Sequence, residues 1–330
     1  MKIGFFEIRP GEQAFFQSAF PQDELIFTTE SLTVADVSKY STLEVVTSHT
    51  GSKIDATVIN ALPSLKLIAT RTTGFDHIDT KAAAAKNIPV CNVPSYGENT
   101  VAEFAFGLIL ALSRRIPDAI NRVRSTKQFD TSGLTGFDLK DQTLGVLGTG
   151  KIGSHLIKMA KGFEMNVIAY DAFPNEKMAT ELGFRYTTLD EVLSTSKIIS
   201  VHVPFLPSTK HLLNSENMPK IQKGAILINT ARGAVIESQA LLNALEQRIL
   251  SAAALDVLED EESLLPNPIA PADPVLSKIN QTLISLPQVY ITPHLAFDSK
   301  EALQRIMQTT VENIQAVQKG TPINLVKPQS

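Results

Sequence analysis

The chain has 330 residues, 43% of them hydrophobic and 19% charged, so it is long enough for two domains that each bury a core. The net charge of −4 excludes a strongly basic surface for nucleic acid, and the single cysteine, Cys91, excludes a disulfide framework and a cysteine-rich metal site. Glu7 and Arg9 come too early for a signal peptide and no apolar run reaches membrane-spanning length, so we expect a soluble, cytoplasmic protein with no metal and with neither nucleic acid nor membrane as a partner.

The first hundred residues alternate between strand and helix patterns. Apolar runs predict strands at 2–8, 44–48, 65–70 and 89–93, and the segments 12–20, 53–62 and 79–86 between them are helix-like. This alternation predicts a parallel sheet covered by helices. Because ligands bind at the carboxyl ends of the strands in such sheets, the loops 48–52, 71–76 and 94–97 are candidate ligand-binding segments.

A long apolar helix is predicted at 99–115. Apolar residues cover most of its faces, which is typical of a helix buried between layers or between subunits. It also lies where one alternating unit ends and the next begins, so we expect an interdomain helix and a dimer element. The segment 129–141, with two glycines and mixed polarity, is predicted to be a loop that leads into the second unit.

The second unit begins with the sequence Gly-x-Gly-x-x-Gly at Gly148–Gly153, between an apolar run and a helix-like stretch at 154–161. This context predicts a strand, a tight turn and a helix N-terminus that bind a pyrophosphate. Gly148 permits the turn, Gly150 lets the backbone approach the phosphates, and Gly153 lets the helix lie close to the strand. Backbone N–H groups and the positive end of the helix dipole would hold the phosphates.

The next apolar run ends at Asp171, 18 residues after Gly153. A carboxylate at the end of the second strand suits the two hydroxyls of an adenosine ribose. It would repel a 2′-phosphate, and the neighbouring Ala172 provides no cation to compensate. The sequence therefore predicts NAD as the cofactor and disfavours NADP.

The rest of the chain continues the alternation. Strands are predicted at 197–203, 225–230, 251–257 and 289–292, and helices at 237–247 and 299–319. Residues 258–288 contain a poorly periodic, proline-bearing excursion at 265–274. The last helix is amphipathic and ends at Gly320, and we expect it to bury its apolar stripe on the first domain.

A nicotinamide cofactor carries the hydride itself, so a 2-oxo acid substrate requires two kinds of group from the protein. A cation must bind the carboxylate, for which arginine is suited, and a proton donor must serve the developing alkoxide, for which histidine is suited. Predicted strand ends offer Arg232, the acidic run Glu259–Glu261 and His294. A carboxylate of the acidic run would orient the imidazole, and the spacing leaves open which one. His202, at another strand end, is predicted to lie near the nicotinamide or its ribose.

Five motifs occur in an order that resembles one enzyme family: Gly148–Gly153, His202–Pro204, Asn229–Gly233, Leu255–Glu261 and Thr292–His294. On these motifs the chain resembles the D-isomer-specific 2-hydroxyacid dehydrogenases over nearly its whole length. The segments 73–79 and 94–103 make it most similar to the D-lactate dehydrogenase branch. The resemblance implies an α/β fold of two Rossmann- or flavodoxin-like parallel-sheet domains. A NAD-binding domain (100–295) would be inserted in a split substrate domain (1–99 and 296–330), and the NAD domains would form a homodimer.

The resemblance also implies site residues. Arg232 matches the catalytic arginine, His294 the acid–base histidine, and Glu261, five residues past Asp256, the glutamate. With the residues already discussed, the implied cofactor site comprises Gly148, Gly150, Lys151, Ile152, Gly153, Asp171, His202, Val203, Pro204, Thr209, Thr230, Ala231 and Asp256. The implied substrate-binding residues are Thr73, Gly74, Tyr96 and Arg232.

The implied reaction is NAD-dependent reduction of pyruvate to D-lactate. At two places the chain departs from the family's sequence pattern, and both bear on which substrate is preferred. Phe297–Asp298 stands where lactate-active relatives often carry an aromatic pair, and the loop 48–52 lacks the aromatic that often closes over a small substrate. A reductase of glyoxylate, hydroxypyruvate or a bulkier 2-oxo acid is therefore an alternative. A NAD-sensing binding protein without turnover is the alternative from another class.

Overall fold

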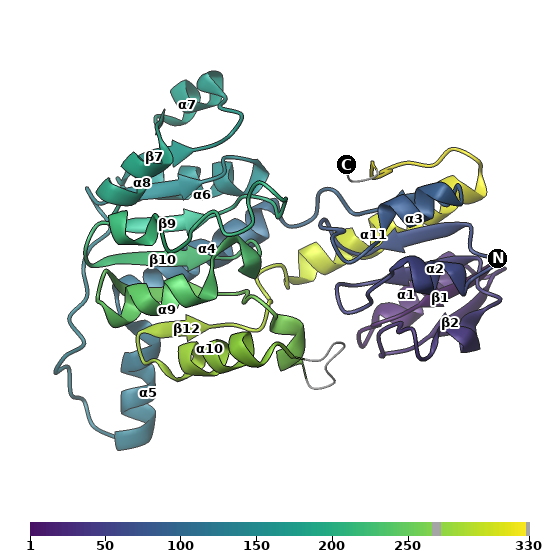
Figure 1. Ribbon diagram of the computed structural model, residues 1–330, viewed down its shortest axis with the longest axis horizontal. Coiled ribbons are helices and arrows are strands. Elements are labelled where there is room, and N and C mark those ends of the chain that lie inside the picture. Colours follow the sequence, from purple (N-terminus) through teal and green to yellow (C-terminus); the bar gives the residue numbers. More distant parts are fainter. Residues whose placement is uncertain (266–271, 328–330) are drawn as a thin grey trace. The chain divides into compact units, whose positions relative to one another are not determined.

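The computed structural model describes residues 1–265 and 272–327, which fold into two compact α/β units. Among the described residues, one unit comprises 1–96 and 299–327, and the other comprises 97–264 and 272–298 (Figure 1). Each unit contains one parallel sheet, of five and of seven strands. The predicted fold class is confirmed, because the second parallel-sheet unit interrupts the sequence of the first.

The first unit contains the strand order β2-β1-β3-β4-β5, and every pairing is parallel. Its strands are β1 (Lys2–Phe5), β2 (Glu24–Phe27), β3 (Val45–Ser48), β4 (Leu67–Thr70) and β5 (Val90–Cys91). Its helices are α1 (Glu12–Ala19), the 3₁₀ turn η1 (Val37–Tyr40), α2 (Ala56–Asn60), α3 (Thr80–Ala85) and α11 (Lys300–Gln318).

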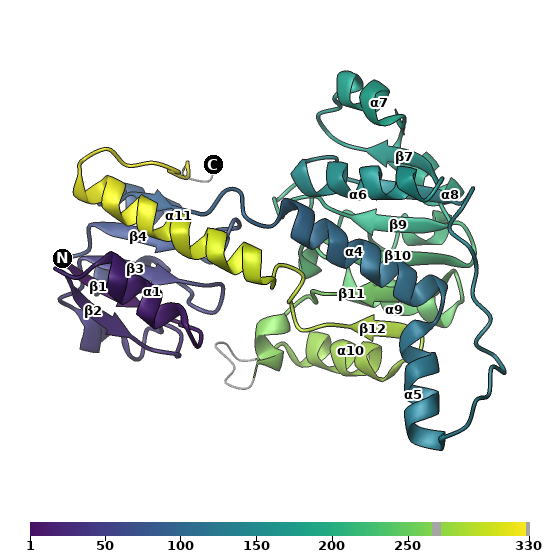
Figure 2. The same ribbon diagram turned by 180° about the vertical axis from the view of Figure 1, so that it is seen from behind.

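Two apolar clusters fill the two faces of this sheet. Phe16 of α1 and Ile314 of α11 pack on one face, and Val58 of α2 and Ala83 of α3 pack on the other. Figure 2 shows α11 running along the sheet beside α1. Asp55, Asp79 and Ser299 cap the N-termini of α2, α3 and α11 by accepting backbone N–H groups, which sets where these helices begin.

The second unit contains the strand order β12-β11-β10-β9-β6-β7-β8, again entirely parallel. Its strands are β6 (Thr143–Leu147), β7 (Asn166–Tyr170), β8 (Arg185–Tyr186), β9 (Ile198–Val201), β10 (Ala225–Asn229), β11 (Leu250–Leu255) and β12 (Val289–Ile291). Its α-helices are α4 (Glu98–Ser113), α5 (Ile116–Thr126), α6 (Lys151–Gly162), α7 (Glu176–Leu182), α8 (Leu189–Thr195), α9 (Ser238–Glu246) and α10 (Pro274–Ser285). The 3₁₀ turns are η2 (Met218–Lys220), η3 (Gly233–Val235) and η4 (Glu261–Leu264).

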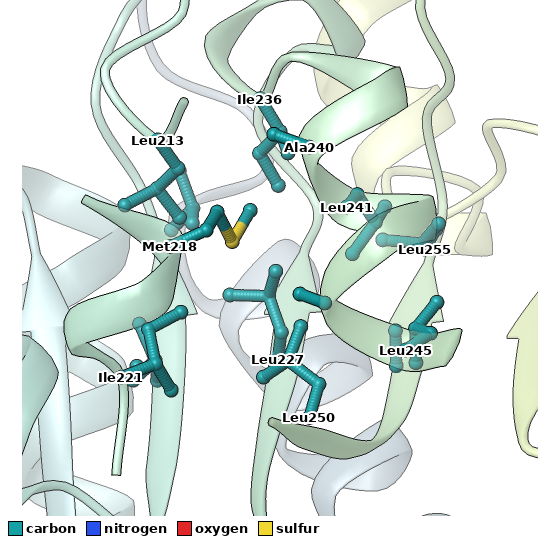
Figure 3. Close-up of a cluster of buried hydrophobic side chains, with 14 of the residues drawn as sticks. Leu213, Met218, Ile221, Leu227, Ile236, Ala240, Leu241, Leu245, Leu250 and Leu255 are labelled. Atoms are coloured by element: carbon teal, nitrogen blue, oxygen red, sulfur yellow. The ribbon is translucent and has the colours of Figure 1, made fainter. Parts of the chain in front are cut away.

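Helices cover both faces of the seven-stranded sheet. Side chains of α8, α9 and α10 form one core cluster with β9, β10 and β11, in which Leu227, Leu241 and Leu255 are almost fully buried (Figure 3). Side chains of α4 and α6 form the other cluster on the opposite face. The predicted apolar helix is thus buried in the second unit, as α4.

The sequence pattern did not predict several of these elements. The poorly periodic excursion was predicted at 265–274, and no helix was predicted after it, yet residues 274–285 form α10, which Asp273 caps and Pro274 begins. Residues 266–271 of the predicted excursion lie outside the described residues. Helices α5, α7 and α8 and the edge strands β2 and β8 also lack a predicted counterpart. The edge strands are four and two residues long and partly exposed, and the longest apolar run in them is the three residues 25–27 of β2, which is too short for a clear strand signal.

Two other kinds of site are absent from the described residues 1–265 and 272–327. None of the helices there combines the length and hydropathy that a bilayer crossing needs. Within the same residues, His, Cys, Asp and Glu side chains form no group of three that could hold a metal ion.

Candidate active site

The glycine-rich turn joins β6 to α6 at the point where the strand order reverses. Chain order runs from β6 outward through β7 and β8, and then returns to β9 on the other side of β6. The loops after β6 and β9 therefore meet at a topological switch point, where α/β sheets bind ligands. A Cβ on Gly148, whose φ is +94°, would lie 2.8 Å from the backbone carbon of His202. Only glycine allows the two loops to approach this closely.

The first turn of α6 is arranged to receive an anion. Gly150 is the N-cap residue and provides no side-chain cap for the backbone N–H groups that follow. A Cβ on Gly153 would lie 2.1 Å from the carbonyl oxygen of Gly148, so this glycine lets the helix pack on the turn. Lys151 and Ile152 lie in the first turn, and the Lys151 ammonium is 3.1 Å from the carboxylate of Glu98. The helix terminus and the lysine both favour a phosphate group here.

Asp171 follows β7 and is tied to the glycine-rich turn. Its Oδ2 accepts the N–H of Thr149 at 2.7 Å and the hydroxyl of Thr149 at 2.9 Å, and its Oδ1 accepts the N–H of Phe173 at 2.9 Å. The hydroxyl of Tyr186 donates to Thr149 Oγ1 at 2.7 Å. The position of Asp171 is therefore fixed by backbone donors. Sequence reasoning missed Thr149, because the fingerprint requires no particular residue between its first two glycines.

His202 follows β9 and is held neutral. Its Nε2 is hydrogen-bonded to the hydroxyl of Ser200 at 2.8 Å, and desolvation by the surrounding protein lowers the pKa of His202 to about 4. Val203 and Pro204 continue the same loop. Thr209 closes it, since the Thr209 hydroxyl donates to the carbonyl of Pro204 at 2.6 Å.

The loop after β10 presents Arg232. Asn229 shapes it, because the Asn229 side chain accepts the N–H of Ala231 and donates to the carbonyl of Arg232, each at 3.0 Å. The guanidinium of Arg232 donates to the carbonyl of Ala231 at 2.8 Å. A Cβ on Gly233 would lie 2.0 Å from the backbone of Leu258, so this loop packs directly on the loop after β11. The hydroxyl of Thr230 is buried without a hydrogen-bond partner among the described residues.

Asp256 follows β11 and fixes the backbone around His294. The carbonyl of Asp256 accepts the N–H of His294 at 2.9 Å. The carboxylate of Asp256 accepts the hydroxyl of Thr292 at 2.5 Å and the N–H groups of Leu295 and Ala296 at 3.0 and 2.8 Å. Burial raises the pKa of Asp256, while these three donors oppose that effect. The predicted cofactor residue Asp256 thus binds this loop with both of its carboxylate oxygens.

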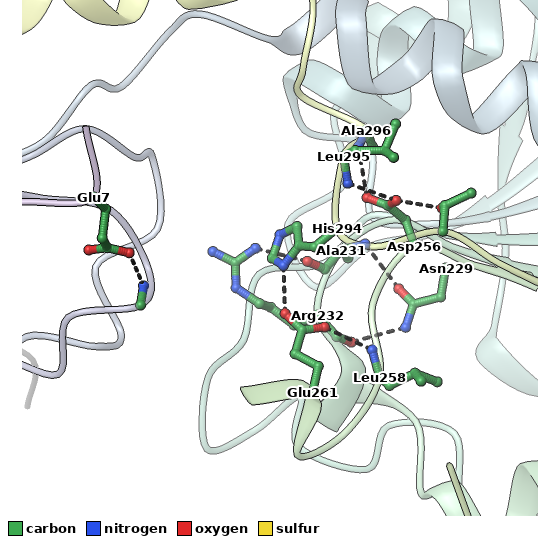
Figure 4. A network of polar contacts seen from close by, with 12 residues as sticks. Glu7, Asn229, Ala231, Arg232, Asp256, Leu258, Glu261, His294, Leu295 and Ala296 are labelled. Carbon is green, nitrogen blue, oxygen red and sulfur yellow. Dashed lines mark hydrogen bonds and ion pairs between the residues drawn. The ribbon is translucent and has the colours of Figure 1, made fainter. Parts of the chain in front are cut away.

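His294 and Glu261 form a pair at the same strand ends. Nδ1 of His294 donates to Oε1 of Glu261 at 2.5 Å, and Oε2 of Glu261 accepts the N–H of Leu258 at 2.9 Å. Within the described part of the chain, Nε2 of His294 has no hydrogen-bond partner. Figure 4 shows the guanidinium of Arg232 beside the imidazole of His294. The structure thus brings together Arg232, Glu261 and His294, from the ends of β10, β11 and β12.

Glu259 points to a different histidine. Oε1 of Glu259 accepts Nε2–H of His211 at 2.7 Å, and Oε2 accepts the hydroxyl of Ser238 at 3.0 Å. The acidic run therefore divides between two pairs, and only Glu261 reaches His294. No sequence pattern indicated His211, because it lies 48 residues from its partner.

The predicted substrate-binding residues of the first unit lie after β4 and β5. The carbonyls of Thr72, Thr73 and Gly74 all accept hydrogen bonds from protein groups. Across the described residues, by contrast, no protein group accepts the N–H of Thr73 or of Gly74. Two successive N–H groups are thus available to an anion. The carbonyl of Tyr96 accepts Nε–H of Arg305 at 2.6 Å.

Comparisons with known proteins identify the family. Residues 106–296 match the family described as D-isomer specific 2-hydroxyacid dehydrogenase, NAD binding domain. The chain is similar to a D-lactate dehydrogenase from Aquifex aeolicus, solved in complex with NAD and lactic acid. Their TM-score is 0.88 and their identity 34%, with 97% of this chain and 96% of that one covered. It is also similar to an aromatic 2-oxoacid reductase of Clostridium sporogenes (40% identical, covering 78% of this chain and 77% of that protein) and to a glyoxylate reductase of Korarchaeum cryptofilum (36%, 84% and 80%).

The chain therefore belongs to the D-isomer-specific 2-hydroxyacid dehydrogenase family. It is a NAD-dependent oxidoreductase that acts on 2-hydroxy acids, which confirms the predicted class of enzyme and the predicted cofactor. The residues of the second unit fit this cofactor. The uncapped N-terminus of α6 suits a pyrophosphate, and the carboxylate at Asp171 suits a ribose without a 2′-phosphate.

Proposed function

We propose that the protein is a D-lactate dehydrogenase that reduces pyruvate to D-lactate with NADH. The observation that carries this proposal is the pair of Glu261 and His294, which leaves Nε2 of His294 available at the end of β12. An oriented imidazole and a neighbouring guanidinium are the two groups that reduction of a 2-oxo acid requires.

In the proposed reaction, the bound cofactor supplies the hydride that becomes bonded to C2 of the substrate. Arg232 binds the substrate carboxylate through its planar fork and polarises the ketone. As the carbonyl π bond breaks, Nε2 of His294 gives its proton to the oxygen. Glu261 accepts Nδ1–H throughout, so it keeps the ring oriented and stabilises the imidazolium form before transfer. In the direction of oxidation, Nε2 takes the proton back.

The remaining residues have separate proposed roles. Gly148, Gly150, Lys151, Ile152 and Gly153 would hold the pyrophosphate, and Asp171 the adenosine ribose. His202, Val203, Pro204, Thr209, Thr230, Ala231 and Asp256 would line the rest of the cofactor site. Because its pKa is about 4, His202 would be neutral at physiological pH and would not compete with His294 as an acid. The free N–H groups of Thr73 and Gly74 would bind the substrate carboxylate together with Arg232, and the ring of Tyr96 would contact it.

Similar proteins and one loop of the first unit bear on which 2-oxo acid is preferred. Lactate is favoured by the similarity to the Aquifex aeolicus enzyme, whereas the similarity to a glyoxylate reductase and an aromatic 2-oxoacid reductase supports the alternatives. The loop 48–52 carries no aromatic side chain. Instead, Glu7 holds it by accepting the N–H groups of His49 and Gly51 and the hydroxyl of Ser52, at 3.0, 2.7 and 2.7 Å. The missing aromatic would also leave room for an acid larger than pyruvate, which is the alternative substrate.

The proposed assembly is a homodimer formed by the second units. Helix α5 has no buried residue, although it presents an apolar stripe of Ile116, Ile120 and Val123, each between 39% and 45% exposed. A groove of about 530 Å³, lined by apolar side chains of α4 and α6 such as Phe106 and Phe163, lies on the same unit. Unpartnered apolar surface of this kind is typical of a subunit interface.

The deciding experiment is NADH oxidation by the purified protein with pyruvate, phenylpyruvate, 2-oxoisocaproate, glyoxylate and hydroxypyruvate, with analysis of the product stereochemistry. Fast turnover of pyruvate to the D-isomer is the expected result. Preference for a bulkier acid or for glyoxylate would retain the mechanism and change the substrate. Binding of NADH without turnover of any acid would favour a NAD-sensing protein, and a His294→Ala variant would be the reference for that inactive state.

A further inference from the structure

We infer that a hydrogen-bonded chain of three asparagines, the buried Asn92 and Asn313 and the partly buried Asn324, positions the backbone N–H groups that bind the substrate carboxylate. The inference rests on the proposed role of Thr73 and Gly74. It assigns a positioning function in catalysis to the last helix and to the segment that follows it.

The first link of this chain of asparagines is Asn92, which follows β5. Its Nδ2 donates to the carbonyl of Thr73 at 2.7 Å. Two further bonds join the same segments: the hydroxyl of Thr73 donates to the carbonyl of Val93 at 2.8 Å, and the N–H of Val93 donates to the carbonyl of Thr72 at 3.0 Å. These bonds hold the carbonyls of residues 72 and 73 against β5. Since a peptide unit is planar, fixing the Thr73 carbonyl also fixes the direction of the Gly74 N–H.

The second link connects this loop to α11 and to the segment that follows it, near the C-terminal end of the polypeptide. Nδ2 of Asn313, on α11, donates to the backbone carbonyl of Asn92 at 2.8 Å. Nδ2 of Asn324 donates in turn to Oδ1 of Asn313 at 2.8 Å, and the carbonyl of Asn324 accepts the N–H of Asn92 at 3.2 Å. The backbone of Asn92 is thus held by one donor from α11 and by one acceptor from the segment beyond it.

Burial and backbone conformation indicate that this arrangement is rigid. Asn313 is fully buried and Asn92 is 8% exposed, so breaking their bonds would leave polar groups without water. Asn324 has φ of +51°, a conformation that asparagine tolerates better than most residues. Val326 then extends the sheet edge, because its N–H donates to the carbonyl of Val90 at 2.9 Å. The last helix therefore does more than cover apolar surface: it fixes the segment from which the Thr73 carbonyl is held.

Kinetics of the full-length protein can test the inference. Asn92→Ala removes the donor to Thr73, and Asn313→Leu removes the support of Asn92 at nearly constant volume. Each variant is expected to raise KM for the preferred 2-oxo acid by about two- to twelvefold, the range expected for loss of one hydrogen bond, with Kd for NADH unchanged. The double variant, Asn92→Ala with Asn313→Leu, is expected to raise KM no further than Asn92→Ala alone. Both substitutions interrupt the same series of hydrogen bonds between asparagines.

Thr310→Val provides a matched control. Thr310 is a buried polar residue on the same helix, but its hydroxyl donates only to the carbonyl of Ile306 within that helix, at 2.8 Å. Thr310→Val should therefore leave KM unchanged.

Hydrogen exchange gives a second measurement that does not depend on activity. Faster exchange of the Val93 amide in Asn92→Ala than in Thr310→Val would show that the loop has loosened. This comparison can be made even if Asn313→Leu fails to fold.

The outcomes separate the two proposals. Unchanged KM and unchanged Val93 exchange in Asn92→Ala would overturn the positioning role and leave the proposed reaction intact. Equal weakening of NADH and substrate binding would also overturn it, since it would indicate general damage. Failure of the unaltered protein to reduce any 2-oxo acid would overturn the proposed reaction and, with it, this inference.

Discussion

Two glutamates of one loop, Glu259 and Glu261, show how the chemistry is determined by individual residues. Their side chains bond to different histidines, His211 and His294, at 2.7 and 2.5 Å. Asp260 between them has φ of +60°, which turns the loop so that the two carboxylates leave it in different directions. His294, at the end of β12, keeps a ring nitrogen without a hydrogen-bond partner among the described residues.

The two pairs can be separated by equivalent substitutions. Glu261→Gln removes the charge that stabilises the imidazolium of His294, and we expect kcat to fall about a hundredfold, at the lower end of the range for acid–base catalysis. Glu259→Gln should change kcat by less than about threefold, because its partner His211 has no role in the proposed reaction. Steady-state kinetics of both variants against the preferred 2-oxo acid would measure the difference. An equal loss in the two variants would contradict the assignment of Glu261.

At the scale of elements, the sequence predicted those whose signal is local. The strands β4 and β10 are fully buried apolar runs, and α11 has a regular apolar stripe, so each could be read without tertiary information. The residues Arg232 and His294 could be predicted because they follow such strands directly. The parallel arrangement then brings strand ends to one edge of the sheet.

Other features depend on contacts that sequence does not display. Helix α10 begins at the last proline of the irregular stretch 265–274 and had no predicted counterpart, and the strand β8 is only two residues long. The support of Asp171 by Thr149, and of Thr73 by Asn92, joins a side chain to backbone from another element. Such contacts have no periodicity, so they become visible only after the chain has folded.

We expect His202, at the end of strand β9, to make the stability of the protein depend on pH. His202 has a folded-state pKa of about 4, below the value of about 6.5 in an unfolded chain, so the unfolded state binds a proton first as pH falls. The free energy of unfolding should therefore be undiminished above about pH 6.5 and decrease by about 1–3 kcal/mol between pH 6.5 and pH 4.

Urea unfolding at pH 7.5 and pH 5 would test this. His202→Gln retains a hydrogen-bonding group near Ser200 but cannot titrate, so it should lose less stability over this interval than the unaltered protein. His155→Gln, on α6, controls for the loss of a histidine elsewhere in the same unit. If His202→Gln and His155→Gln showed the same pH dependence, desolvation of His202 would not be the cause.

At the scale of the whole molecule, the unexplained feature is the apolar surface of the second unit. Figures 1 and 2 show α5 extending away from the sheet of that unit. Its stripe residues recur at intervals of four and three, so they form one face of the helix. Phe129, in the loop that follows, is 97% exposed. A helix without buried residues gains little stability from its own unit, and a second copy of the chain would supply the missing contacts.

We expect Ile120→Glu to disrupt the proposed dimer. A buried, unpaired carboxylate is strongly unfavourable in an apolar interface, so the variant should sediment as a monomer of 35.9 kDa, whereas the unaltered chain should sediment at twice that mass. Ile284→Glu is the matched control, because Ile284 is an exposed isoleucine on α10 of the same unit, 52% accessible compared with 45% for Ile120. It should remain dimeric. A monomeric unaltered chain would refute the dimer itself, whereas a dimer that survives Ile120→Glu would place the interface on another surface and leave the stripe of α5 without a role in assembly.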